Sequence, residues 1–123
     1  MAQRSLIAVV DDDESVRESL PDLLREFGFA ARAFASAEEL LASGCADEAQ
    51  CLILDIAMPG LSGWDLQREL RRHRQTAPVV FITAHGDEAL LPRMLKHGAV
   101  ECLFKPFSDT ALLGAIQAAL QVK

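Results

Sequence analysis

The sequence predicts an α/β protein in which a parallel β-sheet carries helices on both faces. Five short apolar runs alternate along the chain with segments of helical periodicity. Most of these runs are apolar throughout, which is typical of strands buried on both faces of a sheet. The chain has 123 residues, half of them apolar, and this is enough for one compact core. We therefore expect residues 1–123 to form a single domain.

The apolar runs give the expected strands, at residues 6–10, 30–34, 51–54, 79–82 and 100–104. The second is the weakest, because Arg32 interrupts it. Consecutive parallel strands need a crossover between them, and the helical segments supply it.

Five helical segments follow the five strands. The first has apolar residues at spacings of three and four and is expected to end at Gly28. Ser36 and Ser108 are placed to cap the second and fifth helices. We expect the third helix to open at Ser62 and the fourth to cover residues 87–97. Pro21 and Pro92 fall inside these helices, where a missing N–H and a ring clash should kink or shorten them.

Charge and cysteine content exclude several classes of partner. The net charge is −6, and the only dense group of basic residues lies in one predicted helix, so direct binding to nucleic acid is not expected. The three cysteines lack metal-ligand spacing, and two of them lie in apolar strand-like runs where a small buried hydrophobe fits, which favours a reduced, cytoplasmic protein. The first residues are too short for a signal peptide or a membrane span, so we expect no membrane partner.

Reactive residues stand where four of the five strands end. Asp11 and Asp12 follow the first strand, Asp55 the third, Thr83 the fourth and Lys105 the fifth. In an open parallel sheet these positions share one edge, where ligands bind. Three carboxylates in one cleft need a proton or a hard cation, and Mg²⁺ suits their oxygen ligands. A carboxylate beside Mg²⁺ can accept a phosphoryl group, while the lysine adds a second positive charge and the threonine a hydroxyl donor.

Each of these residues also has a structural interpretation. Asp11 and Asp12 could simply favour the positive end of a helix that Asp13 caps. Asp55 could be a turn residue, Thr83 an ordinary strand residue and Lys105 a solvated surface charge. Only their coincidence at the strand ends favours a functional site.

Four motifs resemble those of bacterial two-component receiver domains. They are VVDDD at 9–13, LILDIAMPGLSG at 52–63, FITAHGD at 81–87 and FKPF at 104–107. The resemblance covers essentially the whole chain, and the HGD after the threonine is similar to the FixJ-like subgroup. It implies a doubly wound, flavodoxin-like fold with five helices and strand order 2-1-3-4-5.

The same resemblance implies the roles of the site residues. Asp55 would be the phosphoacceptor, and Asp12, Asp55 and the backbone carbonyl of Ala57 would ligate Mg²⁺, with Asp11 acting largely through water. Thr83 and Lys105 would contact the phosphoryl group, and the peptide bond from Lys105 to Pro106 would be cis.

The resemblance also implies the partners. The donor would be a sensor histidine kinase or a phosphotransfer protein. The modified domain would act on an output domain or effector, with a phosphorylation-dependent dimer as a further option. Such a domain assists its own phosphorylation and dephosphorylation but is not an enzyme acting on other substrates.

Two rival functions remain at this point. A metal-dependent phosphatase with an aspartyl intermediate usually carries a second acid two residues after the nucleophile, where this chain has Ala57. A degenerate receiver that only binds partners would not need its acids, threonine and lysine, and all of them are present.

One position departs from the family pattern. Receivers usually carry Tyr or Phe three residues before the lysine of the fifth strand, and this chain has Cys102. Phe104 would lie on the same face as Cys102 if the strand is regular.

Overall fold

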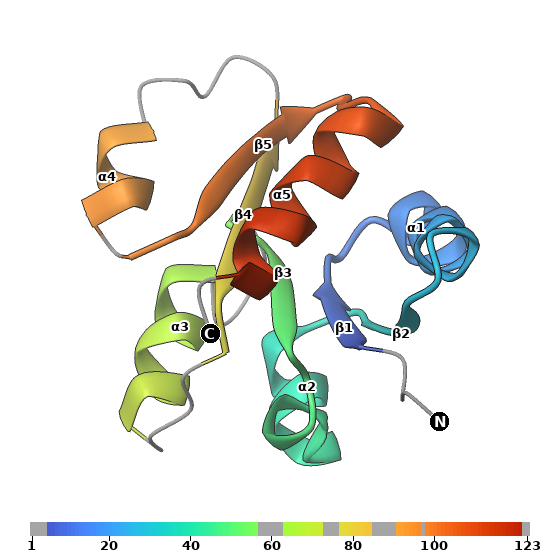
Figure 1. The fold of residues 1–123 in the computed structure, drawn as a ribbon. Helices are drawn as coiled ribbons and strands as arrows, with labels where there is room; N and C mark the ends of the chain where they lie inside the picture. The colour runs from blue at the N-terminus through green and yellow to red at the C-terminus, as the bar shows by residue number, and fades with distance from the viewer. Residues whose placement is uncertain (1–4, 57–62, 73–76, 85–90, 97, 122–123) are drawn as a thin grey trace.

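The computed structural model describes residues 5–56, 63–72, 77–84, 91–96 and 98–121 (Figure 1). Five strands form one sheet: β1 (Leu6–Val10), β2 (Ala30–Phe34), β3 (Cys51–Asp55), β4 (Val79–Ala84) and β5 (Glu101–Lys105). All neighbouring strands run parallel, in the order β2-β1-β3-β4-β5. The predicted parallel sheet and its strand order are confirmed.

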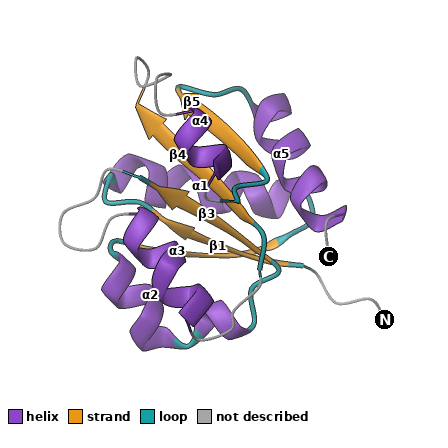
Figure 2. Cartoon of the chain, turned by 90° about the vertical axis from the view of Figure 1, so that its left-hand side faces the viewer, coloured by secondary structure: helices purple, strands orange, loops and turns teal. Residues whose placement is uncertain are grey.

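The described helices are α1 (Glu14–Glu26), α2 (Ala37–Ser43), α3 (Gly63–Arg72), α4 (Leu91–Lys96) and α5 (Asp109–Gln121), together with a short 3-10 turn, η1 (Cys45–Asp47). α1 and α5 cover one face of the sheet, whereas α2 and α3 cover the other, with α4 beside β5 (Figures 1 and 2). The sheet is therefore doubly wound.

Two apolar cores follow from this layering, one on each face. Leu24 of α1 and Leu112 and Ile116 of α5 are fully buried against one face, together with alternate residues of the strands. Leu40 of α2 and Leu66 of α3 are fully buried against the other. The inner strands β1, β3 and β4 are buried on both sides, which explains why their sequences are mainly apolar.

The predicted helix caps are present where the structure describes them. The Ser36 hydroxyl accepts a hydrogen bond from the Glu39 N–H (3.1 Å), and the Ser108 hydroxyl accepts one from the Ala111 N–H (3.0 Å). Gly28 has a φ of 95°, a left-handed conformation that glycine adopts without strain, and it follows the end of α1 as expected. Ser62 lies outside the described residues.

Pro21 does not shorten α1, which was one of the two effects predicted for it. The helix continues to Glu26, and Pro21 is buried on its apolar side, where packing offsets the missing backbone hydrogen bond. Pro92 is the second residue of α4 as bounded here, and in a first turn the N–H has no helical partner to lose. Of the predicted fourth helix, residues 87–90 and 97 lie outside the described part.

Three strand boundaries differ from the predicted ones. β3 includes Asp55, β4 continues through Thr83 to Ala84, and β5 is shifted by one residue to end at Lys105. In each case a polar residue, taken from the sequence as the end of an apolar run, remains in the strand. Asp55, Thr83 and Lys105 are therefore held by the sheet itself.

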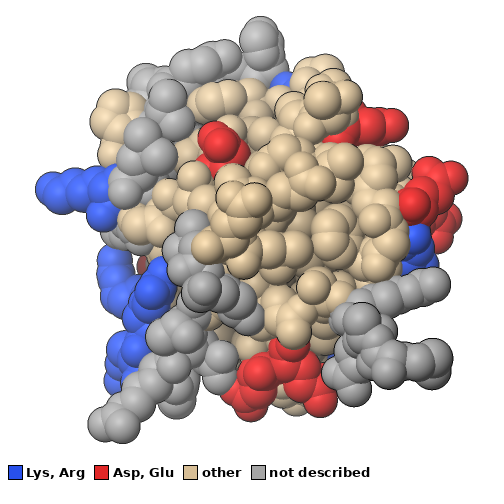
Figure 3. All heavy atoms as spheres, in the orientation of Figure 1, with Lys and Arg blue, Asp and Glu red and all other residues tan. Residues whose placement is uncertain are grey.

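Two further features are the hydropathy of the helices and the distribution of charge on one face of the molecule. None of the described helices is both long and apolar enough to cross a membrane. On the face seen in Figure 3, most of the Lys and Arg lie on the side of α3 and α4, whereas most of the Asp and Glu lie toward α1 and α2. Lys105 is not part of this group, since it belongs to β5 and lies beside the acids at the strand ends.

Candidate functional site

The carboxyl edge of the sheet brings three acids together. Oxygens from the carboxylates of Asp11, Asp12 and Asp55 all lie within 4.8 Å of one another. Asp11 is fully buried, Asp55 is 5% exposed, and Asp12 is exposed. Asp11 and Asp12 belong to the loop after β1, and Asp55 ends the neighbouring strand β3, so the parallel order of these two strands creates the cluster.

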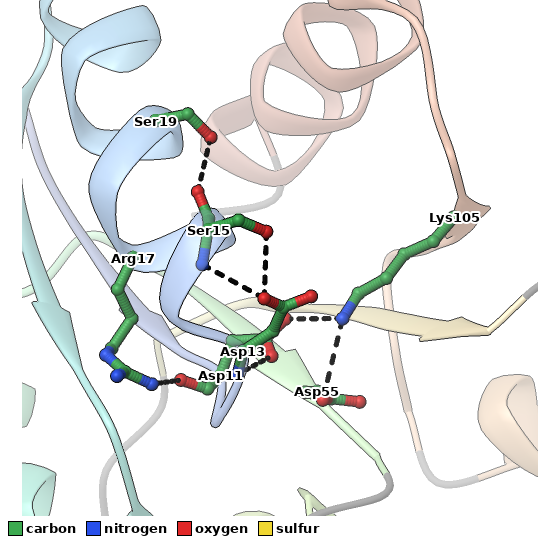
Figure 4. Close-up of polar contacts among 7 residues, drawn as sticks. All are labelled: Asp11, Asp13, Ser15, Arg17, Ser19, Asp55 and Lys105. Atoms are coloured by element: carbon green, nitrogen blue, oxygen red, sulfur yellow. Dashed lines mark hydrogen bonds and ion pairs between the residues drawn. The ribbon is translucent and has the colours of Figure 1, made fainter.

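Lys105 provides the positive charge of this cluster. Its Nζ lies 2.8 Å from Oδ2 of Asp11 and 3.7 Å from Oδ2 of Asp55, although the two acids come from different strands (Figure 4). Lys105 ends β5, and its peptide bond to Pro106 is cis, as predicted. Burial lowers the pKa of Lys105, but the contact with Asp11 and the nearby acid charges outweigh burial, so the net pKa lies above its usual value.

Thr83 reaches the same edge through the strand register. Asp55 of β3 is the partner of Ile82 in β4, and Thr83 is the next residue along β4. Its side chain is 1% exposed. The ion pairs join the lysine to two acids, and the strand register brings Thr83 to the same edge.

The loop after β1 is held by several hydrogen bonds. The Asp13 carboxylate caps α1 by accepting from the N–H and the hydroxyl of Ser15 (3.0 and 2.8 Å), and these bonds lower its pKa. The N–H of Asp13 in turn donates to Oδ1 of Asp11 (2.9 Å). The structural interpretation of Asp13 as a helix cap is correct, and the cap also orients Asp11.

The donor set fits a hard divalent cation. Oδ2 of Asp11 is buried, and within the described part of the chain it has no well-directed hydrogen bond, only the ion pair with Lys105. A buried carboxylate oxygen without a hydrogen bond is costly unless a cation compensates it. Three carboxylates at this spacing supply the oxygen ligands that Mg²⁺ prefers. Ala57, whose carbonyl is a predicted ligand, lies outside the described residues.

A groove of about 420 Å³ adjoins the cluster, between α1 and the connection from β5 to α5. Lys105 contributes to both the groove and the acid cluster. The remaining lining is mainly apolar and consists of Val16, Ser19, Leu20, Leu23, Pro106, Phe107 and Asp109. The sequence analysis missed this groove, because its walls come from residues some ninety positions apart.

Cys102 and Phe104 lie on the same face of β5, as the regular register requires. Both pack with the core under α2 and α3, and Phe104 is the direct cross-strand partner of Thr83. All three cysteines are free and buried, including Cys45, which lies outside the strands. Burial raises the pKa of the Cys102 thiol to about 11.

Comparison with known proteins identifies the class of this site. Residues 7–117 match the family model described as "Response regulator receiver domain". The chain belongs to this family of two-component signalling domains, whose function is that of a phosphoacceptor switch, as the motifs predicted.

Individual relatives place the chain near the FixJ-like receivers. It is 47% identical to Nodulation protein W of Bradyrhizobium diazoefficiens over 118 residues, 96% of this chain and 52% of that protein. It is 40% identical to Transcriptional regulatory protein FixJ of Azorhizobium caulinodans over 114 residues, 93% of this chain and 54% of that protein. The chain thus spans about half the length of these curated relatives.

Solved structures agree with this placement. The response regulator StyR superposes with a TM-score of 0.87 at 46% identity, covering 98% of this chain and 61% of that one. The structure named FixJ-N gives a TM-score of 0.86 at 38% identity, covering 98% and 96% of the two chains.

Proposed function

We propose that Asp55 is the phosphoacceptor of this receiver domain, and that residues 1–123 act as one switching unit. The observation that carries this proposal is the convergence of three carboxylates and Lys105 at the carboxyl edge of the sheet. Asp55 is suited to the role because it ends a central strand, is nearly buried, and has its carboxylate within 3.7 Å of the lysine ammonium.

Phosphoryl transfer at this site requires a nucleophile and charge neutralisation. An oxygen of Asp55 attacks the phosphorus, the bond to the donor histidine nitrogen breaks, and the imidazole leaves. Asp12 and Asp55 would hold Mg²⁺ together with the Ala57 carbonyl, with Asp11 acting largely through water. When bound there, Mg²⁺ would supply positive charge beside the phosphoryl oxygens. The Lys105 ammonium moves from the acids to the phosphoryl oxygens, and the Thr83 hydroxyl donates a hydrogen bond to them.

The new contacts of Thr83 and Lys105 are the proposed source of the switch. Phosphorylation shifts a two-state equilibrium only by its difference in free energy between the states, and a shift from mostly inactive to mostly active needs roughly 5 kcal/mol. The modified domain then binds an output domain or effector with altered affinity. A phosphorylation-dependent dimer is an alternative output.

The donor is a sensor histidine kinase or a phosphotransfer protein, as for receiver domains in general. The apolar groove beside Lys105 supports this proposal, because it offers a docking surface next to the acceptor. The buried free thiols are consistent with a cytoplasmic location. A phosphatase acting on other substrates is not favoured, since the comparisons place the chain among signalling domains.

Mass spectrometry after incubation with a small acyl phosphate and Mg²⁺ tests the acceptor. We expect one added phosphoryl mass on the wild-type chain, none on Asp55→Asn, and none when Mg²⁺ is chelated. Asp13→Asn is the matched control, because it removes a neighbouring acid while asparagine still caps the helix. Equal modification of Asp55→Asn and the wild type would overturn the proposal.

A further inference from the structure

Three polar groups of Asp11 make hydrogen bonds. Its N–H donates to the carbonyl of Phe34 in β2 (3.1 Å), and its Oδ1 accepts from the Asp13 N–H (2.9 Å). Its carbonyl accepts a hydrogen bond from a guanidinium nitrogen of Arg17 (3.0 Å; Figure 4). Only Oδ2 remains, and it faces Lys105. Asp11 therefore has little freedom to turn.

Of these three hydrogen bonds, only the one from Arg17 is donated by a side chain. It comes from a side chain on the first turns of α1 and reaches back six residues to the end of β1. The guanidinium is half-buried and permanently charged, so this hydrogen bond is stronger than a neutral one. Because a side chain makes it, substitution can remove it without changing the acids.

The carbonyl that Arg17 binds belongs to the peptide group between Asp11 and Asp12. This group is planar, so fixing its oxygen also fixes the direction of the following N–H and restricts how the Asp12 side chain leaves the backbone. One contact therefore restrains both acids that follow β1.

We infer that Arg17 is a positioning residue for the cation site: it orients Asp11 and Asp12 without touching the cation. This inference rests on the proposed function of the acid cluster as a Mg²⁺ site. Residues that orient metal ligands commonly affect affinity without contacting the metal.

Because Arg17 is charged, the direction in which its substitution changes Mg²⁺ affinity tests this role. A positive charge near the acids repels Mg²⁺, so loss of that charge alone would strengthen Mg²⁺ binding. Loss of orientation would weaken it. The two explanations thus predict opposite changes for the same substitution.

Arg25 provides a matched control. Its guanidinium also reaches six residues along the chain to a backbone carbonyl, that of Ala31, at 3.1 Å. This bond joins the other end of α1 to β2, away from the acids. Its additional ion pair with Asp22 is exposed and contributes little.

Isothermal titration calorimetry of the whole chain with Mg²⁺ tests the inference. We expect Arg17→Met to weaken Mg²⁺ binding by about tenfold, as for other residues that orient metal ligands. Arg25→Met should bind Mg²⁺ as the wild type does, although both variants lose one similar hydrogen bond. Arg17→Lys keeps the charge but not the forked geometry, so it should also bind more weakly than the wild type.

Several outcomes would overturn this role for Arg17. Unchanged or tighter Mg²⁺ binding by Arg17→Met would do so, and so would an equal loss in Arg25→Met. Urea unfolding identifies any variant that fails to fold, and if Arg17→Met fails, Arg17→Lys with wild-type affinity would refute the inference. If the wild-type chain itself binds no Mg²⁺, the proposed cation site is wrong as well. The wild-type titration therefore distinguishes failure of the cation site from failure of the Arg17 role.

Discussion

Replacing Lys105 by methionine should destabilise the metal-free protein. Its ammonium lies 2.8 and 3.7 Å from carboxylate oxygens of Asp11 and Asp55, and at an effective dielectric constant of about 20 these distances correspond to attractions of about 6 and about 4.5 kcal/mol. Desolvation offsets much of this, and removing one partner from a buried pair costs about 3–5 kcal/mol. Because the Lys105 side chain is 26% exposed, we expect a loss of about 2–3 kcal/mol.

Urea unfolding at neutral pH measures this loss, with and without Mg²⁺. The difference between the wild type and Lys105→Met should shrink when Mg²⁺ is added, because the metal then compensates the acids. Lys96→Met is the matched control, since Lys96 is an exposed lysine of α4. Equal stability of Lys105→Met and the wild type in metal-free buffer would refute the electrostatic account of the cluster.

The pH dependence of the same difference follows from the raised pKa of Lys105. A cation whose pKa is higher in the folded state than in the unfolded state contributes its full stabilisation below the unfolded value. The contribution should therefore be constant through neutral pH and fall only as the pH rises beyond 10.5, the ordinary value for lysine. A difference that disappears by pH 9 would contradict this assignment.

Three further predictions concern neighbouring features. Asp13→Ala should destabilise the chain at neutral pH, and because hydrogen bonds from Ser15 lower the Asp13 pKa below 3.8, urea unfolding should show this difference vanishing as the solution is acidified past that value. Burial raises the thiol pKa of Cys102 from 9.0 to about 11, so the wild type should lose stability relative to Cys102→Ala as the pH rises through that interval; parallel unfolding curves would contradict this. Leu23→Glu places a charge in the groove and should slow phosphoryl transfer from a kinase but not from a small acyl phosphate; equal slowing from both donors would argue against docking there.

The fold was largely predictable because most of the strands are nearly continuous apolar runs. β1 and β2 have the predicted bounds. The ends of β4 and β5 were misjudged because Thr83 and Lys105 were taken as terminators. In the structure each has a cross-strand partner, Phe104 and Ala84 respectively, so the ladder continues through both polar residues.

The site was predictable to the extent that it depends on strand ends. Parallel strands bring their carboxyl ends to one edge, so Asp11, Asp55 and Lys105 had to lie near one another. Their relative burial was not predictable, because it depends on how the loop after β1 turns. The contact of Arg17 was missed because an arginine on a helix surface is usually a solvated charge, and because the contact also depends on the course of that loop.

A crystal structure with Mg²⁺ and beryllium trifluoride, which imitates a phosphoryl group on a carboxylate, tests the central claim most directly. We expect the beryllium to bond to an oxygen of Asp55, with Mg²⁺ about 2.0–2.1 Å from oxygens of Asp12 and Asp55. Thr83 and Lys105 should then contact the fluorides. Beryllium bonded to another residue, or Mg²⁺ held without Asp55, would contradict the account.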